Sequence, residues 1–556
     1  MSVQQLEFVQ QPGFVQQPEF VQQLEPVADS LALSALVAAL PLVTVLVLLG
    51  AVRMRAHLAG LAGLAVALAT ACLAFRMPAG QALSSAAQGA LFGLFPILWI
   101  VVNALWVYRM TVRTRHFDVL RRSFSGLSAD PRVQALVVAF CFGALLEALA
   151  GFGAPVAISA VMLVALGFTP ARAAVVALVA NTAPVAFGAM GTPVVTLAQV
   201  TGLPLDTVAP VVGRQTPLLA LVVPLLLVFL VDGRRGLRET WVPALACGVA
   251  FAAVQFAAAN HVSAQLADIG AALAGAAALV AVPGARRPAA EPVRAAVLTG
   301  ARSEDLDVRD SRADVVRAYA PYALIVVVFS LAQVPPVRDL LARATRTFDW
   351  PFLDVAGPDG EPAGGNVFSL PLLATGGTLV LLAGVLSAPV LGVRAATAVR
   401  EWAATVRELR PAILTVTSVL ALAYVMNLSG QAATIGHFVA AAGAGLAFLS
   451  PVLGWFGVAV TGSDTSANAL FGALQVTAAR QSGLSPVLLA AANSSGGVLG
   501  KMISPQNLAI ACAAVGLAGR EGDLLRKVLP WSLGLLLVMC LIVVGQSTAV
   551  LGWMLP

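Results

Sequence analysis

The sequence predicts an all-α polytopic membrane protein. Three observations predict this class: 59% of the residues are hydrophobic and only 11% are charged, the mean hydropathy is +0.89, and apolar stretches of about 20 residues recur along nearly the whole chain. Soluble domains average roughly 25% charged residues. Because a soluble chain this apolar could not cover its surface with polar groups, we expect it to lie in a lipid bilayer.

We expect about twelve transmembrane helices. They are predicted over residues 30–50, 58–75, 86–108, 171–198, 217–231, 240–259, 265–282, 319–334, 369–388, 411–427, 485–518 and 530–552. Two further apolar regions, 133–168 and 450–480, are each expected to form a re-entrant helical hairpin that returns to the side from which it started. Residues 1–29, in which Phe-Val-Gln-Gln occurs three times, are expected to be a disordered tail ahead of one membrane domain over 30–556.

Basic residues gather in the short segments after every second span, beginning with Arg53 and Arg55 after the first span. Positively charged loops stay in the cytoplasm. We therefore expect both termini outside, a cytoplasmic loop over 283–318 and an external loop over 335–368. The net charge of +6 is then a signal for membrane topology, and we expect no nucleic-acid partner.

An internal repeat of helix-breaking segments is the most informative motif. The first half contains Gly151-Phe152-Gly153-Ala154-Pro155 and Ala180-Asn181-Thr182-Ala183-Pro184, and the second contains Thr461 to Ser466 and Ala492 to Gly497. A shift of 312 positions places Asn181 on Asn493, Gly188 on Gly500, Met190 on Met502 and Pro193 on Pro505. With the topology above, the cores at about 133–202 and 450–518 form an inverted repeat with broken helices, as in many secondary transporters.

The polar segments at the breaks are the candidate binding site. Irregular backbone at membrane depth is tolerated only where it is buried in protein or lines a water-filled cavity, and free N–H groups at helix N-termini suit a carboxylate. The alternative is that these small residues serve only close helix packing. The candidate substrate-binding residues are Gly151, Gly153, Asn181, Thr182, Ser463, Thr465, Ser466, Asn468, Asn493, Ser494, Ser495 and Lys501.

Glu147, Asp464 and Lys501 are ionisable residues close to the breaks. Burial of a carboxyl favours its protonated form, so Glu147 or Asp464 is the candidate proton carrier. The alternative is a structural role, in which one of them caps a helix or pairs with Lys501. The sequence contains no HExxH, GxSxG or Walker motif, so we expect no catalytic residues, no cofactor and no metal.

At these residues the chain resembles the lactate permease family, which also includes glycolate permeases. The matching segments are Glu147 with 150–155, then 180–189, 461–466 with 468–472, and 493–498 with 500–506. The resemblance covers most of 30–556 and departs from the family pattern at Ala148, where the family has Gly. It implies proton-coupled symport of L-lactate and related 2-hydroxy monocarboxylates (D-lactate and glycolate) across the bacterial cytoplasmic membrane.

A sodium-coupled carboxylate or oxyanion transporter of the same architecture is the alternative function, because hydroxyl-rich breaks and unwound carbonyls would also serve sodium. The expected partners are the small monocarboxylate, protons and the lipid bilayer. The sequence leaves open the preferred acid and its chirality, the proton stoichiometry, the oligomeric state (a homo-oligomer included), and whether the motion is of the elevator or the rocking kind.

Overall fold

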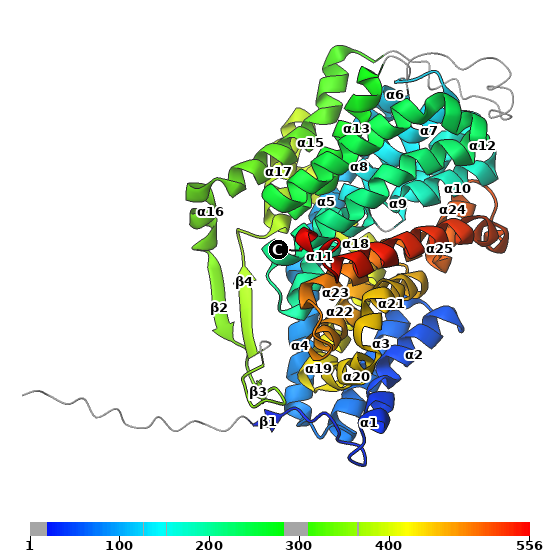
Figure 1. The fold of residues 1–556 in the computed structure, drawn as a ribbon. Helices are drawn as coiled ribbons and strands as arrows, with labels where there is room; N and C mark the ends of the chain where they lie inside the picture. The colour runs from blue at the N-terminus through cyan, green and yellow to red at the C-terminus, as the bar shows by residue number, and fades with distance from the viewer. Residues whose placement is uncertain (1–18, 126, 152, 283–309, 364–365, 556) are drawn as a thin grey trace, which may run out of the picture.

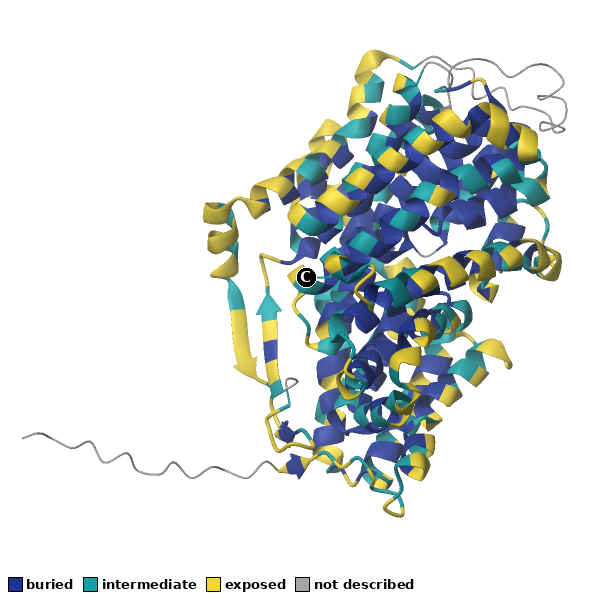
Figure 2. Ribbon diagram, in the orientation of Figure 1, coloured by how far each residue is buried: buried dark blue, intermediate teal, exposed yellow. Residues whose placement is uncertain are grey.

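The chain folds into one bundle of helices (Figure 1). A computed structural model describes residues 19–125, 127–151, 153–282, 310–363 and 366–555. Within these ranges, nine helices are long and apolar enough to cross a membrane, and two pairs of shorter helices, each bent at a break, raise the number to 11. Buried residues fill the interior of the bundle (Figure 2). The predicted helical membrane fold is confirmed, whereas the number of spans remains a prediction.

The first helices of the chain form a layer with a helix from its second half. Helix α19 (Arg410–Leu428) packs against both α3 and α4. A side chain at Gly89 of α4 would lie 2.8 Å from the Cα atom of Ala421, so glycine permits this close approach. The elements are β1 (Phe20–Val21), α1 (Leu31–Ala38), α2 (Leu40–Gly50), α3 (Ala56–Leu73), α4 (Ala79–Phe92), the π-helical turn η1 (Gly93–Leu98) and α5 (Trp99–Arg113).

The first repeat core follows an amphipathic helix, α6 (His116–Ser125). It begins with a continuous helix made of α7 (Pro131–Ala135), η2 (Leu136–Phe142) and α8 (Gly143–Ala150), after which α9 (Ala154–Ala165) packs back against η2 and α8. Helix α10 (Pro170–Ala180) and the segment η3 (Val185–Phe187) with α11 (Gly188–Thr201) are bent by 66° about the residues between them. The core thus contains a helix–turn–helix unit and a broken helix.

The middle of the chain contains helix α12 (Leu205–His261), whose two arms are antiparallel. Its backbone leaves helical geometry at Asp232, Gly233 and Thr240. A side chain at Gly248 would lie 2.9 Å from the carbonyl oxygen of Ala220, in the first arm. The arms therefore correspond to the two spans predicted over 217–231 and 240–259. The next elements are η4 (Ala264–Leu266), α13 (Ala267–Ala281), α15 (Arg312–Gln333), α16 (Pro335–Ala342), β2 (Thr345–Asp349), β3 (Val355–Ala356), β4 (Val367–Pro371), α17 (Gly376–Val390) and α18 (Ala395–Glu408).

The second repeat core contains the same two kinds of unit. Helix α21 packs against α22, and α23 is followed by a break and by α24. Residues 431–445, which the sequence analysis assigned to no span, are helical and lead into α21. The elements are α20 (Gln431–Val439), η8 (Ala440–Gly445), α21 (Leu446–Thr461), α22 (Asp464–Gln481), α23 (Pro486–Gly500), η9 (Lys501–Ile503), α24 (Pro505–Ala514), α25 (Glu521–Gln546) and η10 (Gly552–Met554).

Each core packs against the other in a reciprocal way. The second arm of the first helix–turn–helix unit, α9, contacts α24, which follows the break of the second core. The second arm of the other unit, α22, contacts α11, which follows the break of the first core. This exchange is the arrangement that an internal repeat with approximate twofold symmetry requires.

The basic segments meet at one end of the bundle. Arg113 donates a hydrogen bond of 2.8 Å to Glu401, and Arg122 forms an ion pair with Asp310 at 2.6 Å. Hydrogen bonds from the Arg122 guanidinium hold the pKa of Asp310 below its usual range. Segments that follow different spans are thereby joined, as expected if all of them face the same side of the membrane.

Both ends of the described chain lie away from these basic segments (Figure 1). Strand β1 pairs in parallel with β3, in the loop between α16 and α17. Near the other terminus, the carbonyl oxygen of Met554 accepts a hydrogen bond of 2.7 Å from Arg214, which lies about five turns along α12 from the basic turn at 232–240.

Two segments that the sequence left outside the predicted spans make contacts within the described residues. The predicted disordered tail of 1–29 falls partly outside them, but residues 19–29 are ordered by contacts: Phe20 pairs with Val355, and the side chain of Gln22 donates to the carbonyl oxygens of Asn427 and Leu428 at 2.9 and 3.0 Å. The external loop of 335–368 contains α16 and an antiparallel pair, β2 with β4. The N-terminal segment is held by partners more than 300 positions away, whereas β2 pairs with β4, which is close to it in the sequence. The cytoplasmic loop of 283–318 lies outside the described residues up to 309, and α15 begins at Arg312 within it.

Candidate functional site

Glu147 is positioned by the turn between α8 and α9. Helix α8 ends at Gly151, which has φ 44° and ψ −147°, and α9 begins after Gly153, which has φ 84°. Only glycine adopts such a backbone without strain. A side chain at Gly153 would also lie 3.3 Å from the amide oxygen of Asn507 on α24. Glu147, on the last turns of α8, is buried.

The break between α10 and α11 contains strained backbone. Ala189, Met190 and Gly191 adopt left-handed conformations in succession, with φ of 44°, 58° and 74°. Each such position in a non-glycine residue costs on the order of 1–3 kcal/mol, and strain of this kind is found at functional sites. Gly188 precedes it, and a side chain there would lie 2.8 Å from Oε1 of Glu147. The break therefore makes room for the Glu147 carboxyl.

The second helix–turn–helix unit places Asp464 at the start of α22. Gly462, with φ 74°, ends α21, and the side chain of Ser463 caps α22 by accepting a hydrogen bond of 3.3 Å from the backbone N–H of Ser466. Asp464 does not take the capping role: its Oδ2 atom accepts from Ser494 at 2.6 Å and from Asn468 at 3.4 Å. Its Oδ1 atom has no partner among the residues that the structure describes.

The predicted break at Ala492 to Gly497 is wrong, because α23 continues through it from Pro486 to Gly500. The chain leaves the α-helix eight residues after Asn493, at Lys501–Ile503, and resumes as α24 at Pro505. The small residues serve close packing instead. A side chain at Gly454 of α21 would overlap the carbonyl group of Asn493, and one at Gly496 would overlap that of Pro451.

Lys501, at this break, pairs with Glu147. Its Nζ atom lies 2.5 Å from Oε1 of Glu147, and the two side chains are 9% and 4% exposed. The other carboxyl oxygen of Glu147 has no hydrogen-bond partner in the described part of the chain. Pairing with Lys501 was the structural alternative expected for one of the two carboxyls, and in the structure Glu147 makes this pair.

A cavity of about 620 Å³ lies between the two cores. It reaches from the Glu147–Lys501 pair to Arg55 and Glu408, which stand at the end of the bundle with the basic segments. Seven of the predicted site residues line it: Glu147, Gly151, Ser463, Asp464, Thr465, Ser466 and Lys501. The cavity brings residues of α8, α22 and η9 together.

The other predicted residues lie behind the cavity wall. Asn493 donates a hydrogen bond of 2.9 Å to Asn468, whose own amide donates to the carbonyl oxygen of Pro193 at 3.1 Å. Ser494 supports Asp464, and Thr182 donates within its own turn to the carbonyl oxygen of Val179 at 2.8 Å.

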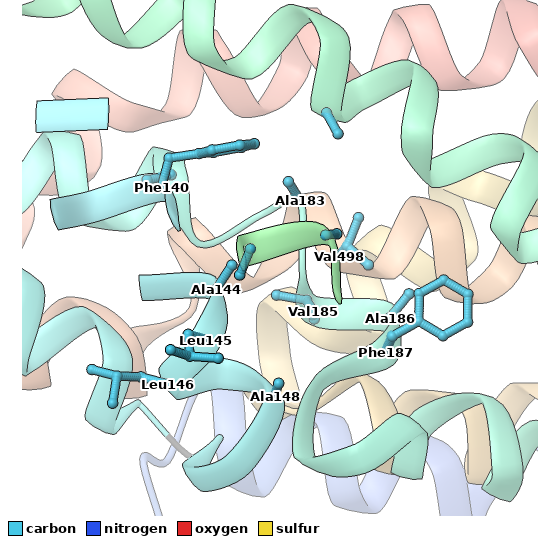
Figure 3. Close-up of a cluster of buried hydrophobic side chains, with 14 of the residues drawn as sticks. Phe140, Ala144, Leu145, Leu146, Ala148, Ala183, Val185, Ala186, Phe187 and Val498 are labelled. Carbon is cyan, nitrogen blue, oxygen red and sulfur yellow. The ribbon is translucent and has the colours of Figure 1, made fainter. Parts of the chain in front are cut away.

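Two of these residues carry unpartnered polar atoms. Neither amide atom of the buried Asn181, nor the hydroxyl of Ser495, has a partner within the described ranges. Figure 3 shows Ala144 of α8, Val185 of η3 and Val498 of α23 in one cluster of buried hydrophobic side chains. Gly153, the last of the set, packs against α24 as described above.

Sequence reasoning missed several residues of this region. Gln506, Thr415 and Gly188 line the cavity. Gly188 and Gln506 stand in the segments 180–189 and 500–506 that carry the family resemblance, whereas nothing in the local sequence marks Thr415. Asp268, on α13, is 1% exposed. It falls inside the span predicted over 265–282, so its charge within an apolar stretch was the signal that could have identified it. Among the described residues, no group of three or more His, Cys, Asp or Glu side chains could hold a metal ion.

Comparison with known proteins identifies the family to which the chain is similar. A sequence model described as L-lactate permease matches residues 34–550. The chain is 43% identical over 560 residues to an L-lactate permease of Bacillus subtilis and 40% identical over 546 residues to one of Escherichia coli, covering 95% of this chain and 98% of the relative in both cases. It is also 40% identical over 529 residues to the glycolate permease GlcA of Escherichia coli, covering 90% and 94% of the two chains.

Proposed function

Because the chain belongs to the L-lactate permease family, we propose that it transports L-lactate and related 2-hydroxy monocarboxylates, including D-lactate and glycolate, across the bacterial plasma membrane together with protons. The names of the relatives support the substrate class. The charged residues of the site support the coupling to protons.

The ion pair between Glu147 and Lys501 is the observation that carries the proposal. Among the described residues that line the cavity, Lys501 is the buried cation, and its charge is already matched by Glu147. A carboxylate substrate that enters the cavity needs a cation or hydrogen-bond donors, because its charge is expensive to remove from water. Protonation of Glu147 releases Lys501 to bind that carboxylate.

The charges explain why proton and substrate travel together. With the ion pair intact, Glu147 and Lys501 sum to zero; with the proton on Glu147 and the substrate anion beside Lys501, the sum is again zero. Binding of the anion without the proton would leave an uncompensated buried charge, which costs several kcal/mol. Asp464, the other buried carboxyl on the cavity, must also be neutral when the anion is bound.

The hydroxyl-rich start of α22 supplies the remaining contacts. Ser463, Thr465 and Ser466 line the cavity at the N-terminus of that helix, where the positive end of the helix dipole favours an anion. Gln506, near the start of α24, adds an amide with both a donor and an acceptor. Such a set suits a small molecule that carries one carboxylate and one hydroxyl group.

Transport then requires the cavity to face each side of the membrane in turn. The cavity opens toward the basic segments, which we place in the cytoplasm with both termini outside. The reciprocal packing of the two cores allows one part of the bundle to move against the other about the central ion pair. Both elevator and rocking motions satisfy this requirement.

The test is radiolabelled L-lactate uptake into proteoliposomes, with the pH gradient and the membrane potential imposed separately. One proton carried with one lactate anion is electrically neutral, so a pH gradient alone should give about tenfold accumulation per pH unit. A membrane potential alone should give none. Competition by glycolate, D-lactate and pyruvate defines the substrate class.

Variants of the two carboxyls complete this test. Glu147→Gln and Asp464→Asn should abolish pH-driven accumulation while the protein still inserts into the membrane, which is checked by its yield and by its elution as a single species. Normal accumulation by both variants would refute the proton assignment. Replacement of sodium by choline serves as the control for the alternative coupling, and loss of uptake in choline would favour sodium.

A further inference from the structure

Another buried carboxyl, Asp268, lies outside the cavity. It is on the first turn of α13 and is 1% exposed. One oxygen, Oδ1, accepts a hydrogen bond of 2.8 Å from the side chain of Gln255. The other oxygen has no partner among the described residues. A buried carboxyl with a single hydrogen bond is expensive to keep in a structure, so a functional reason for it is expected.

Gln255 connects Asp268 to the broken helix of the first core. The same amide nitrogen lies 3.3 Å from the carbonyl oxygen of Ala183, between α10 and η3. Its amide oxygen accepts a hydrogen bond of 3.4 Å from Thr216. Gln255 thus links Asp268 to the break between α10 and α11, which makes room for the Glu147 carboxyl.

The charged groups that face Asp268 are those of the proposed coupling pair. Helix α13 packs against α8, η2, η4, α11 and α12. Glu147 is the titratable residue of α8 and pairs with Lys501 of η9, while η4 and α11 contain no titratable residue. The thiols of Cys141 on η2 and Cys247 on α12 lie near Gly275, two turns further along α13.

A second cavity begins one turn before Asp268. It has a volume of about 520 Å³, and its lining includes Gln265, Gln199, Pro371 and Thr375. The last two residues belong to the end of β4 and the start of α17, at the end of the bundle opposite the basic segments. Residues three apart share one side of a helix, so Asp268 lies one turn from Gln265 in the lining of this cavity.

We propose that Asp268 is a second proton-binding residue of the transport cycle, which passes the proton between Glu147 and the second cavity. In uptake, a proton from water in the second cavity binds the Asp268 carboxylate, moves to the Glu147 carboxylate and is released into the first cavity when Glu147 pairs again with Lys501. Both the proton and the substrate then use the Glu147–Lys501 pair, but only the proton passes through Asp268. This inference rests on the proposed function.

The test compares two measurements on Asp268→Asn in proteoliposomes. Lactate counterflow at equal pH exchanges substrate for substrate and needs no net proton transfer, whereas pH-driven uptake does. We expect the ratio of pH-driven uptake to counterflow to fall by about tenfold or more, as for loss of a positioned proton-transfer group. Asp268→Glu should restore the ratio. A merely structural role would lower both rates together and leave their ratio as in the wild type.

A second pair of variants keeps the test decisive if Asp268→Asn fails to fold. Gln255→Leu removes the hydrogen bond but keeps the acid, and should shift the pH at which uptake is half-maximal. Gln215→Leu, a buried amide on the same helix that pairs with Gln546, should not. If the wild type couples lactate to protons, either of two results overturns the inference: an unshifted pH profile of uptake for Gln255→Leu, or a wild-type ratio of pH-driven uptake to counterflow for Asp268→Asn. If the wild type itself does not couple lactate to protons, the proposed function is refuted instead.

Discussion

Gly188 is the residue that allows the Glu147 carboxyl to sit at the cavity. A Cβ atom there would lie 2.8 Å from Oε1 and 3.0 Å from Cγ of Glu147, both too close for ordinary contact. The carboxyl would have to move, and with it one side of the ion pair with Lys501. The position of the Glu147–Lys501 pair therefore depends on Gly188 of α11, whose lack of a side chain leaves space for the carboxyl, as well as on the two paired residues.

Gly188→Ala should consequently impair transport. A displacement of about 1 Å at a reacting group can reduce a rate by about 100-fold, so we expect a loss of that order in pH-driven uptake. The measurement is the initial rate of L-lactate uptake at saturating substrate. Gly534→Ala, on α25, is the matched control, because a side chain at that position meets nothing within 4 Å. Equal rates for the two variants would contradict the role of Gly188.

The sequence alone identified three charged residues of the cavity and offered a pair between Lys501 and one of the two carboxyls, but not which carboxyl. Glu147, Asp464 and Lys501 were conspicuous because charges are rare within apolar spans. The ion pair joins residues 354 positions apart, and no local pattern encodes such a contact. Asp268 was overlooked because it stands close to the start of its span, where a charge is ordinary.

At the scale of elements, α21 and α23 are held together by backbone contact. Gly454 lies against the carbonyl group of Asn493, and Gly496 against that of Pro451. Glycine brings two helix axes close enough for such packing. The same small residues also permit a helix break, which is why the sequence predicted a break at Asn493 to Gly497 where the structure has a continuous helix.

Gly496→Ala should therefore destabilise the protein. Inserting a methyl group into a filled interface costs typically 1–3 kcal/mol, so we expect an earlier thermal unfolding transition in detergent. Differential scanning fluorimetry of the purified variant measures it, with Gly522→Ala as control, since a side chain at Gly522 also meets nothing within 4 Å. An unchanged transition would mean that α21 can move away at little cost.

At the scale of the whole molecule, the basic segments lie together at one end of the bundle, and the topology expected from them stays a prediction. Basic segments that follow separate spans meet through pairs such as Arg122 with Asp310. The two ends of the described chain lie at the other end of the bundle. The order of residues 19–29 was not predictable, because it depends on β3 and on α19, which are more than 300 positions away.

Accessibility of the cavity can be tested with introduced cysteines. Thr415 lines the cavity, so Thr415→Cys should react with a membrane-impermeant thiol reagent applied from the cytoplasmic side, and lactate should slow this reaction. Val550→Cys, 74% exposed near the C-terminus, should react only from outside. The wild type, with its own cysteines, gives the background. Labelling of both variants from the same side would contradict the proposed orientation.

The reciprocal packing of the two cores has a mechanical consequence. Helix α11 contains the strained turn of the first core and packs against α22, which carries Asp464 of the second core. In the same way, α24 of the second core packs against α9 of the first. A shift at either gap must displace the turn of the opposite copy. We therefore expect the two cores to move together during transport rather than independently.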